Sequence, residues 1–208
     1  LHNTSDSDYY SFMVEVEQYD AYNTDYQPDI YNYSFGNYSG SFVLDENMEP
    51  LLLKQDPSIA LVRQGNGFKF TMSNGTIYLF DVVETTKSRN SCSQNDVQFH
   101  NSAWYLGEIQ NYNGDIIYFD YVLDNMLYDS AYNESVTKIT GSDCPSVPNG
   151  TNYSECSVTA EVNAQKLSKI WNNRNDETID FISSSSRADM SSGGLKLNDI
   201  LLKIGQDE

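Results

Sequence analysis

A turn-centred segment that recurs three times is the feature that most constrains the fold of this 208-residue chain. The copies are residues 74–81, 113–120 and 175–182, and each begins with Asn-Gly or Asn-Asp. Asn-Gly suits a two-residue turn in which both central residues take positive φ. The fourth and sixth residues after the asparagine are large and apolar, and a period of two places them on one face of a strand. The pattern predicts antiparallel hairpins with an almost fully buried core that contains Phe80, Phe119, Ile179 and Phe181.

The strand before the turn also has a recurring pattern. Leu106-x-x-Ile109, Leu167-x-x-Ile170 and Leu197-x-x-Ile200 share a spacing of three residues. Strict alternation would place the leucine and the isoleucine on opposite faces of the sheet. We therefore predict a β-bulge between them, at Gly107 in the first case, which returns both side chains to the core.

Other parts of the chain alternate in the same way. Tyr31 to Phe35 and Phe42 to Leu44 flank a Gly-containing turn, and Phe68 to Met72 precedes the first copy. Tyr, Phe, Ile, Val and Thr favour strands, and we find no segment that predicts a helix of about ten residues or more. We expect an all-β fold of antiparallel hairpin repeats that form a curved open sheet or a wrap resembling a β-sandwich or barrel.

The organisation expected is one domain over residues 1–208, with a sub-boundary near an insertion at 123–164 that goes to loops. Residues 85–102 are expected to form a long polar loop. Residues 195–204 are predicted to be a strand that pairs with 178–182 and leaves its other edge open. Because few residues follow this strand, we expect the chain to be a fragment of a longer repeat protein.

The charge of the chain restricts its partners. Acidic residues exceed basic ones by 30 to 12, which gives a formal net charge of −18. Such a surface repels nucleic-acid phosphates and anionic lipids, so we expect no nucleic-acid partner. No apolar run approaches the roughly 18 residues that would span a bilayer, and no membrane insertion is expected. The charge favours solubility in an extracytoplasmic setting over binding of Ca²⁺ or of cationic partners.

Three cysteines, Cys92, Cys144 and Cys156, are present, and none belongs to a Cys-x-x-Cys pair. The sequence therefore predicts no zinc site and no other metal site. A Cys144–Cys156 disulfide would close the polar loop between these two residues, and we favour that pairing. Three pairings are open if one bridge forms, and three free thiols are the alternative.

The repeated unit resembles the YD or Rhs-type repeats of large secreted bacterial proteins, as in the N-terminal part of Bacteroides-type members. The resemblance rests on the Leu-x-x-Ile strand, the Asn-Gly turn and the following x-Ile-x-x-Phe, and it covers residues 28–204. Phe80-Asp81 and Phe119-Asp120 stand where the family has Tyr-Asp. The resemblance implies an extended β-sheet wrap that serves as a shell or scaffold and is not itself catalytic.

Catalytic residues are not predicted. Nucleophilic catalysis needs a Ser or Cys with a histidine and an orienting carboxylate, and His100 is the only plausible base. Phosphate-binding glycine loops are missing, because Gly65-Asn66-Gly67 lacks a following lysine and helix. We expect no cofactor.

The segment from residue 19 to residue 38 is rich in Tyr, Asn and Ser, which suits either a recognition surface or a sheet. Its candidate binding residues are Tyr19, Tyr22, Tyr26 and Tyr38.

Three hypotheses about function follow from these patterns. The leading one is a non-catalytic structural or interaction module of a large secreted or surface-exposed bacterial repeat protein. Its partners would be other segments of the same parent chain, or a protein or glycan ligand. The alternative is a carbohydrate-binding β-domain, which an exposed row of coplanar aromatic rings would favour, whereas burial of Tyr31, Tyr33 and Phe35 would favour the module. The second alternative is a carboxylate-dependent hydrolase domain.

Overall fold

The structure is a computed structural model that describes residues 29–92, 98–139, 150–174, 177–185, 187, 189–190 and 192–205. These residues form eleven strands and no helix, and every strand pair is antiparallel. The predicted all-β fold is therefore confirmed. The chain divides into two compact units, residues 1–56 and 57–208, so the division lies between β3 and β4. The expected sub-boundary at 123–164 instead falls within β8 and β9.

The first unit contains a three-stranded sheet in the order β1 (Tyr31–Phe35), β2 (Tyr38–Leu44) and β3 (Pro50–Leu52). Its strands join through a tight turn in which Gly36 takes a φ of 54°, a value that glycine adopts without steric cost. Phe42 is buried and its ring stacks on that of Tyr31 at 5.2 Å. The alternating aromatic residues of this segment thus form one covered face of the sheet.

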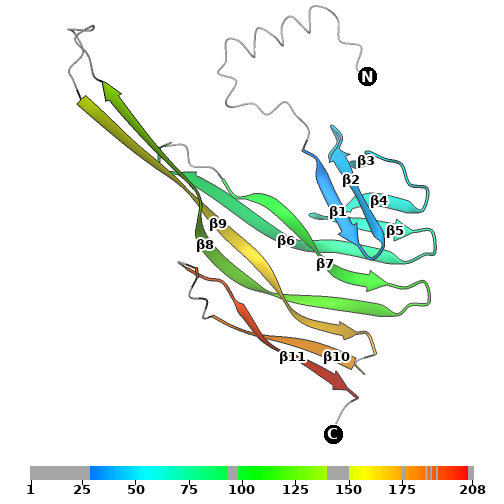
Figure 1. The fold of residues 1–208 in the computed structure, drawn as a ribbon. Coiled ribbons are helices and arrows are strands. Elements are labelled where there is room, and N and C mark those ends of the chain that lie inside the picture. Colours follow the sequence, from blue (N-terminus) through cyan, green and yellow to red (C-terminus); the bar gives the residue numbers. More distant parts are fainter. Residues whose placement is uncertain are drawn as a thin grey trace, which may run out of the picture. The chain divides into compact units, whose positions relative to one another are not determined.

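The second unit is an eight-stranded sheet in the order β11-β10-β9-β8-β7-β6-β5-β4 (Figure 1). The C-terminal half of β6 also pairs with β9, so β6, β7, β8 and β9 form a closed circuit of pairings, a partial barrel. The strands are β4 (Ile59–Gln64), β5 (Gly67–Met72), β6 (Ile77–Asn90), β7 (His100–Gln110), β8 (Ile116–Ile139), β9 (Gly150–Asn172), β10 (Glu177–Ser184) and β11 (Lys196–Ile204).

The core of this unit follows the period of its strands. Phe68, Phe70 and Met72 on β5 are buried, whereas the residues between them are only half-buried. A second cluster lies on β9, where small and branched side chains pack closely beside the strands of the partial barrel. Its members are Ala160, Val162 and Ala164, with Met126 of β8 packed against them.

Two of the repeated turns have the same structure, which differs from the predicted two-residue turn. Only the glycine takes positive φ, 83° at Gly75 and 88° at Gly114. In both turns the glycine N–H donates to the carbonyl three residues earlier, and the asparagine side chain accepts from the residue after the glycine. This is a turn followed by a left-handed glycine, a common hairpin connection. The third turn, at 175–176, lies outside the described residues.

The three predicted bulges are confirmed. Leu106 lies opposite Phe80 and Glu108 lies opposite Leu79, so Gly107 is skipped in the pairing of β7 with β6. The residue directly after the leucine is skipped in the other two copies as well, at Ser168 and Asn198. Each leucine therefore shares a face with the isoleucine three residues later.

The predicted core residues share equivalent positions but are not fully buried. Phe119 lies opposite Ile170, and Phe181 lies opposite Ile200. Their neighbours on adjacent strands cover their flanks, which leaves part of each ring accessible. All four predicted residues are half-buried in this way: Phe80, Phe119, Ile179 and Phe181.

Two segments expected to be loops belong to strands. Residues 85–90 continue β6, and His100 to Ser102 begin β7, so the loop predicted at 85–102 is much shorter. The insertion at 123–164 lengthens β8 and β9, which pair with each other continuously from Ile117–Asn172 to Ile139–Gly150. An insertion between two antiparallel strands can extend both when each residue gains a partner on the other strand.

Candidate functional site

The predicted tyrosine site is not assembled in the described part of the chain. Tyr19, Tyr22 and Tyr26 lie outside the described residues. Tyr38 lies on β2, where it is half-buried and its ring centroid is 5.8 Å from that of Phe35. We therefore interpret Tyr38 as a packing residue of its sheet.

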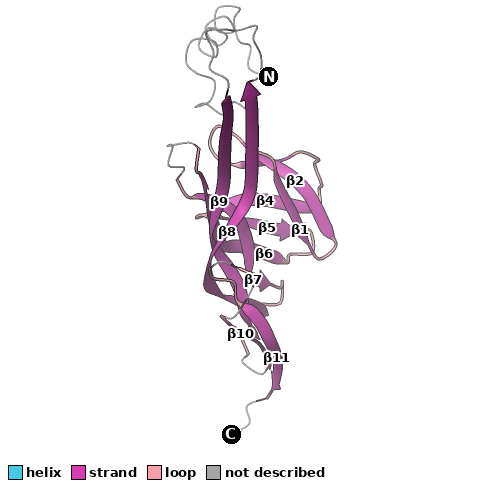
Figure 2. Ribbon diagram, turned by 60° about the vertical axis from the view of Figure 1, so that its left-hand side comes forward, coloured by secondary structure: helices cyan, strands magenta, loops and turns pink. Residues whose placement is uncertain are grey.

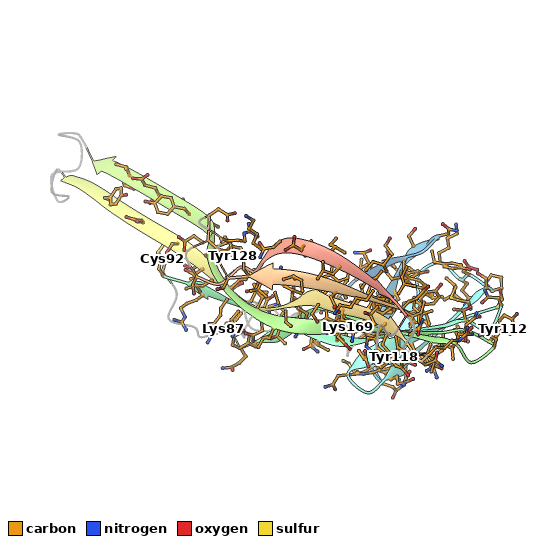
Figure 3. The ribbon with its side chains drawn as sticks, turned by 90° about the horizontal axis from the view of Figure 1, so that it is seen from below. Lys87, Cys92, Tyr112, Tyr118, Tyr128 and Lys169 are labelled. Atoms are coloured by element: carbon orange, nitrogen blue, oxygen red, sulfur yellow. A yellow bond between two sulfur atoms is a disulfide. The ribbon has the colours of Figure 1, made fainter. Side chains whose placement is uncertain are left out.

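The predicted disulfide is wrong in its pairing. Cys156 is bonded to Cys92, with 5.4 Å between the two Cα atoms, whereas Cys144 lies outside the described residues. The cause is the pairing of β6 with β9, which places Asn90 opposite Val158 and so brings the two cysteines together. The 64 residues between them gave no local signal for this pairing. Figure 3 shows Cys92 where β8 and β9 leave the other strands.

The ends of β8 and β9 form a two-stranded ribbon that extends beyond the rest of the sheet (Figures 1 and 2). The ribbon consists of residues 131–139 paired with residues 150–158. Tyr132 is 58% exposed, Val136 61% and Tyr153 55%. Large exposed side chains gathered on one element mark an interaction surface more often than a packing surface.

One side of the ribbon carries these three side chains together. Val136 lies opposite Tyr153, and Glu134 lies opposite Glu155. Residues that face each other across an antiparallel pair lie on the same face, as do alternate residues along a strand. We call this set of five side chains the ribbon face: Tyr132, Glu134, Val136, Tyr153 and Glu155.

The hydroxyl group of Tyr153 lies at the centre of the ribbon face. It donates to Oε2 of Glu155 at 3.4 Å. Hydrogen bonding to Glu134, and then to Tyr132, raises the pKa of Tyr153 above its ordinary value. The tyrosine therefore stays neutral and donates toward the carboxylates, which gives the ribbon face both apolar rings and acceptors.

A shallow pocket of about 230 Å³ lies where the ribbon joins the sheet. Its floor is a row of three residues across three strands, Leu127, Glu161 and Lys87, on the same side as the ribbon face. Lys87 Nζ is 5.9 Å from the ring centroid of Phe99. The pocket therefore adds cations to a surface that otherwise carries carboxylates. Its lining residues are Lys87, Arg89, Leu127, Thr159 and Glu161.

A second aromatic group lies at the opposite end of the long strands (Figure 3). Tyr118 and Trp171 stack at 4.3 Å with 26° between their planes, and Lys169 Nζ is 6.0 Å from the Trp171 ring centroid. Trp171 Nε1 donates to Asp120 Oδ2 at 2.9 Å. The two rings cover each other and are not side by side, so this group differs from the row of coplanar rings expected of a sugar platform.

Acidic and tyrosine side chains meet between β6 and β7. Glu84 accepts from the Tyr105 hydroxyl at 3.0 Å and from Ser102 Oγ at 3.1 Å. Burial, followed by the bond to Glu84, raises the pKa of Tyr105 to about 12. Burial also raises the pKa of Asp81, and Glu108 adds to that effect. This group stabilises the pairing of two strands and contains no histidine base.

The base considered from sequence lies elsewhere on the strand. His100 is the exposed first residue of β7, opposite Thr86. The geometry therefore supplies no general base for the acidic cluster.

A buried carboxylate that the sequence did not reveal anchors the loop before β11. Asp124 is 4% exposed and accepts from the backbone N–H groups of Gly194 at 2.9 Å and Leu195 at 2.7 Å. A side chain at Gly193 would collide with the carbonyl oxygen of Asn125, so the loop passes β8 at the closest distance a backbone allows. These contacts position β11.

Within the described ranges, no three His, Cys, Asp or Glu side chains form a group that could hold a metal ion. The described residues also contain no helix of the length and hydropathy needed to cross a membrane. Fold and site together define an all-β protein of antiparallel hairpins with a projecting ribbon. Searches against protein-family models, curated proteins and solved structures found no match to the chain.

Proposed function

We propose that this chain is a non-catalytic structural and interaction module of a large secreted or surface-exposed protein, and that the ribbon face contacts its partner. The observation that carries the proposal is the exposure of Tyr132, Val136 and Tyr153 on one side of a ribbon that extends beyond the sheet. The partner is a protein surface, either another segment of the parent chain or a separate ligand.

The chemistry of the ribbon face supports recognition. Tyrosine offers a large rigid surface with few rotatable bonds, so little side-chain entropy is lost on binding. Glu134 and Glu155 add acceptors beside the two tyrosine rings. The disulfide at Cys156 fixes the base of the ribbon to the end of β6, which limits the motion that a partner would have to restrain.

Two further observations support the setting and the parent. Disulfides persist in oxidising compartments, and Cys92–Cys156 is consistent with an exported protein. The shared turn structure at Gly75 and Gly114 and the three bulges support a hairpin-repeat parent of the YD or Rhs type.

Site-specific photo-crosslinking tests the proposal. A photoreactive phenylalanine analogue replaces Tyr132 or Tyr153 in the protein displayed on cells that carry it naturally. The matched control is Tyr112, which is 78% exposed at a turn outside the ribbon. We expect a discrete crosslinked protein product from positions 132 and 153 and none from 112. Equal products at all three positions, or none at the two ribbon positions, would contradict the proposal.

A carbohydrate ligand is the second candidate, because tyrosine rings and carboxylate acceptors lie together on the ribbon face. A glycan array probed with the wild-type chain and with Tyr132→Ala and Tyr153→Ala variants separates the two. Binding that both variants reduce about tenfold or more would identify a glycan ligand in place of a protein. Tyr112→Ala is again the control.

A further inference from the structure

Strand β11 is an edge of the sheet that carries an unusual number of exposed aliphatic side chains. It pairs with β10 on one side, and all nine of its residues are exposed. Soluble proteins normally protect such an edge with charges, a proline or a covering segment. Its exposed fractions are 49% for Leu197, 57% for Ile200, 46% for Leu201, 63% for Leu202 and 67% for Ile204.

The two faces of β11 differ in character. Ile200, Leu202 and Ile204 share one face, and the first two of these lie opposite Phe181 and Ile179 of β10. This apolar face continues across β10 to β9, because Ile179 also lies opposite Ile170. The other face carries Asp199, Leu201 and Lys203, so one negative and one positive charge lie symmetrically about Leu201.

We propose that β11 pairs with β11 of a second copy of this chain, antiparallel and about a two-fold axis through Leu201. The axis is perpendicular to the sheet, so both copies present the same face on the same side. Asp199 of each copy then lies opposite Lys203 of the other, and Ile200 lies opposite Leu202. The eight-stranded sheets become one continuous sheet, and the apolar faces meet across the junction.

Charge selects this register over its neighbours. With the axis two residues earlier, Asp199 would face Asp199 of the other copy, and like charges placed opposite each other destabilise a strand pair. With the axis at Ile200, Lys203 would face Leu197 and Asp199 would face Leu201. Only the axis at Leu201 brings both ionic pairs together, and a self-complementary arrangement of this kind forms a closed dimer.

The contacts inside one copy are compatible with the pairing. Lys203 Nζ lies 2.6 Å from Asp180 Oδ2 on β10. In the dimer the ammonium group would lie between Asp180 of its own chain and Asp199 of the other, and its three N–H donors can serve both carboxylates. The association is independent of the proposed function, because it uses β11 and the proposed function uses the ribbon face.

Charge-swap variants of the full chain test the dimer by sedimentation velocity over about 1–200 μM, the range in which a small interface associates. We expect the wild type to form a dimer that dissociates on dilution. Asp199→Lys and Lys203→Asp each place like charges at both ionic contacts, and each alone should weaken the dimer at least about tenfold. A mixture of the two variants restores opposite charges at both contacts, so a heterodimer should form with wild-type-like affinity.

A matched control separates the contact from the overall charge. Asp29→Lys makes the same charge change at an exposed residue of the first unit and should leave the dimer intact. Lys203→Asp also loses the pair with Asp180, so circular dichroism and thermal unfolding must show an unchanged fold; Asp199→Lys, which leaves that pair in place, carries the test alone if they do not.

Three results would overturn the inference. These are a wild type that stays monomeric throughout the range, single variants that dimerise like the wild type, and species that grow beyond a dimer. The last result would indicate head-to-tail pairing of β11 with the other sheet edge, β4, which forms open chains.

Discussion

Single backbone angles determine where the hairpins of this protein turn. Gly75 and Gly114 adopt left-handed φ values of 83° and 88°, and the asparagine before each glycine caps the turn with its side chain. The region is unfavourable for residues with a Cβ atom, which explains the glycine at both positions. The Asn-Gly pair thus identified the turns from sequence, but their conformation depends on the glycine alone.

Gly114→Ala tests this conformational requirement without steric contact, because an added Cβ would meet no atom within 4 Å. We expect a loss of about 1 kcal/mol in the free energy of unfolding, measured by urea denaturation. Gly114→Asn should lose less, because asparagine tolerates the left-handed region better. An alanine variant as stable as the wild type would show that the turn can adopt another conformation.

Tyr105 links stability to pH. Its pKa is about 12 in the folded chain, against 10.0 for an ordinary tyrosine. Between these values the unfolded chain has lost a proton that the folded chain keeps. The contribution of Tyr105 to stability is therefore complete below pH 10 and decreases as the pH rises toward 12.

Tyr105→Phe removes this contribution and gives a direct comparison. The wild type should lose stability more steeply than the variant between about pH 10 and 12, when urea denaturation is measured at each pH. Parallel curves would show that Glu84 and burial do not hold the proton on Tyr105.

At the scale of the element, short-range patterns were predictable and long-range pairings were not. The spacing of three between Leu106 and Ile109 was sufficient to predict a bulge at Gly107, because strict alternation would have exposed one of the two side chains. The pairing of β6 with β9 has no counterpart in any local pattern, and the error in the disulfide followed from it. Burial depth was overestimated at Phe119 for a related reason, since periodicity assigns a face but not what covers it.

The Cys92–Cys156 disulfide should stabilise the partial barrel by restricting the unfolded chain. It closes a segment with a sequence separation of 64 residues that includes β7 and most of β8. Replacement of both cysteines by serine should lower the free energy of unfolding by about 2–4 kcal/mol. Hydrogen exchange should increase most in residues 85–90, where β6 pairs with β9 beside the disulfide. Uniformly faster exchange across the sheet would argue against a local role.

At the scale of the whole molecule, the distribution of exposed side chains separates the structural part of the sheet from its projections. The buried residues of the second unit lie on β4, β5, β8 and β9 within the sheet, whereas the described ribbon side chains at 131–137 are all exposed. Burial of apolar surface is the main source of folding stability, so the ribbon should contribute little of it. The binding site considered from sequence, Tyr19 to Tyr38, gave no indication of this element, because the ribbon tyrosines are far apart in the chain and meet only through the register of β8 and β9.

Shortening the ribbon tests this division. Replacement of residues 135–154 by Asn-Gly retains the Glu134–Glu155 pair and the disulfide at Cys156 but removes Val136 and Tyr153. Because the deleted pairs contact only each other, the free energy of unfolding should change by less than about 1 kcal/mol, and the midpoint of thermal unfolding should move by only a few degrees. The crosslink from position 132 should nevertheless weaken or disappear, since half of the ribbon face is missing. A large loss of stability would mean that the ribbon is part of the folding core, and an unchanged crosslink would place the contact at the pocket beside Lys87 and Glu161.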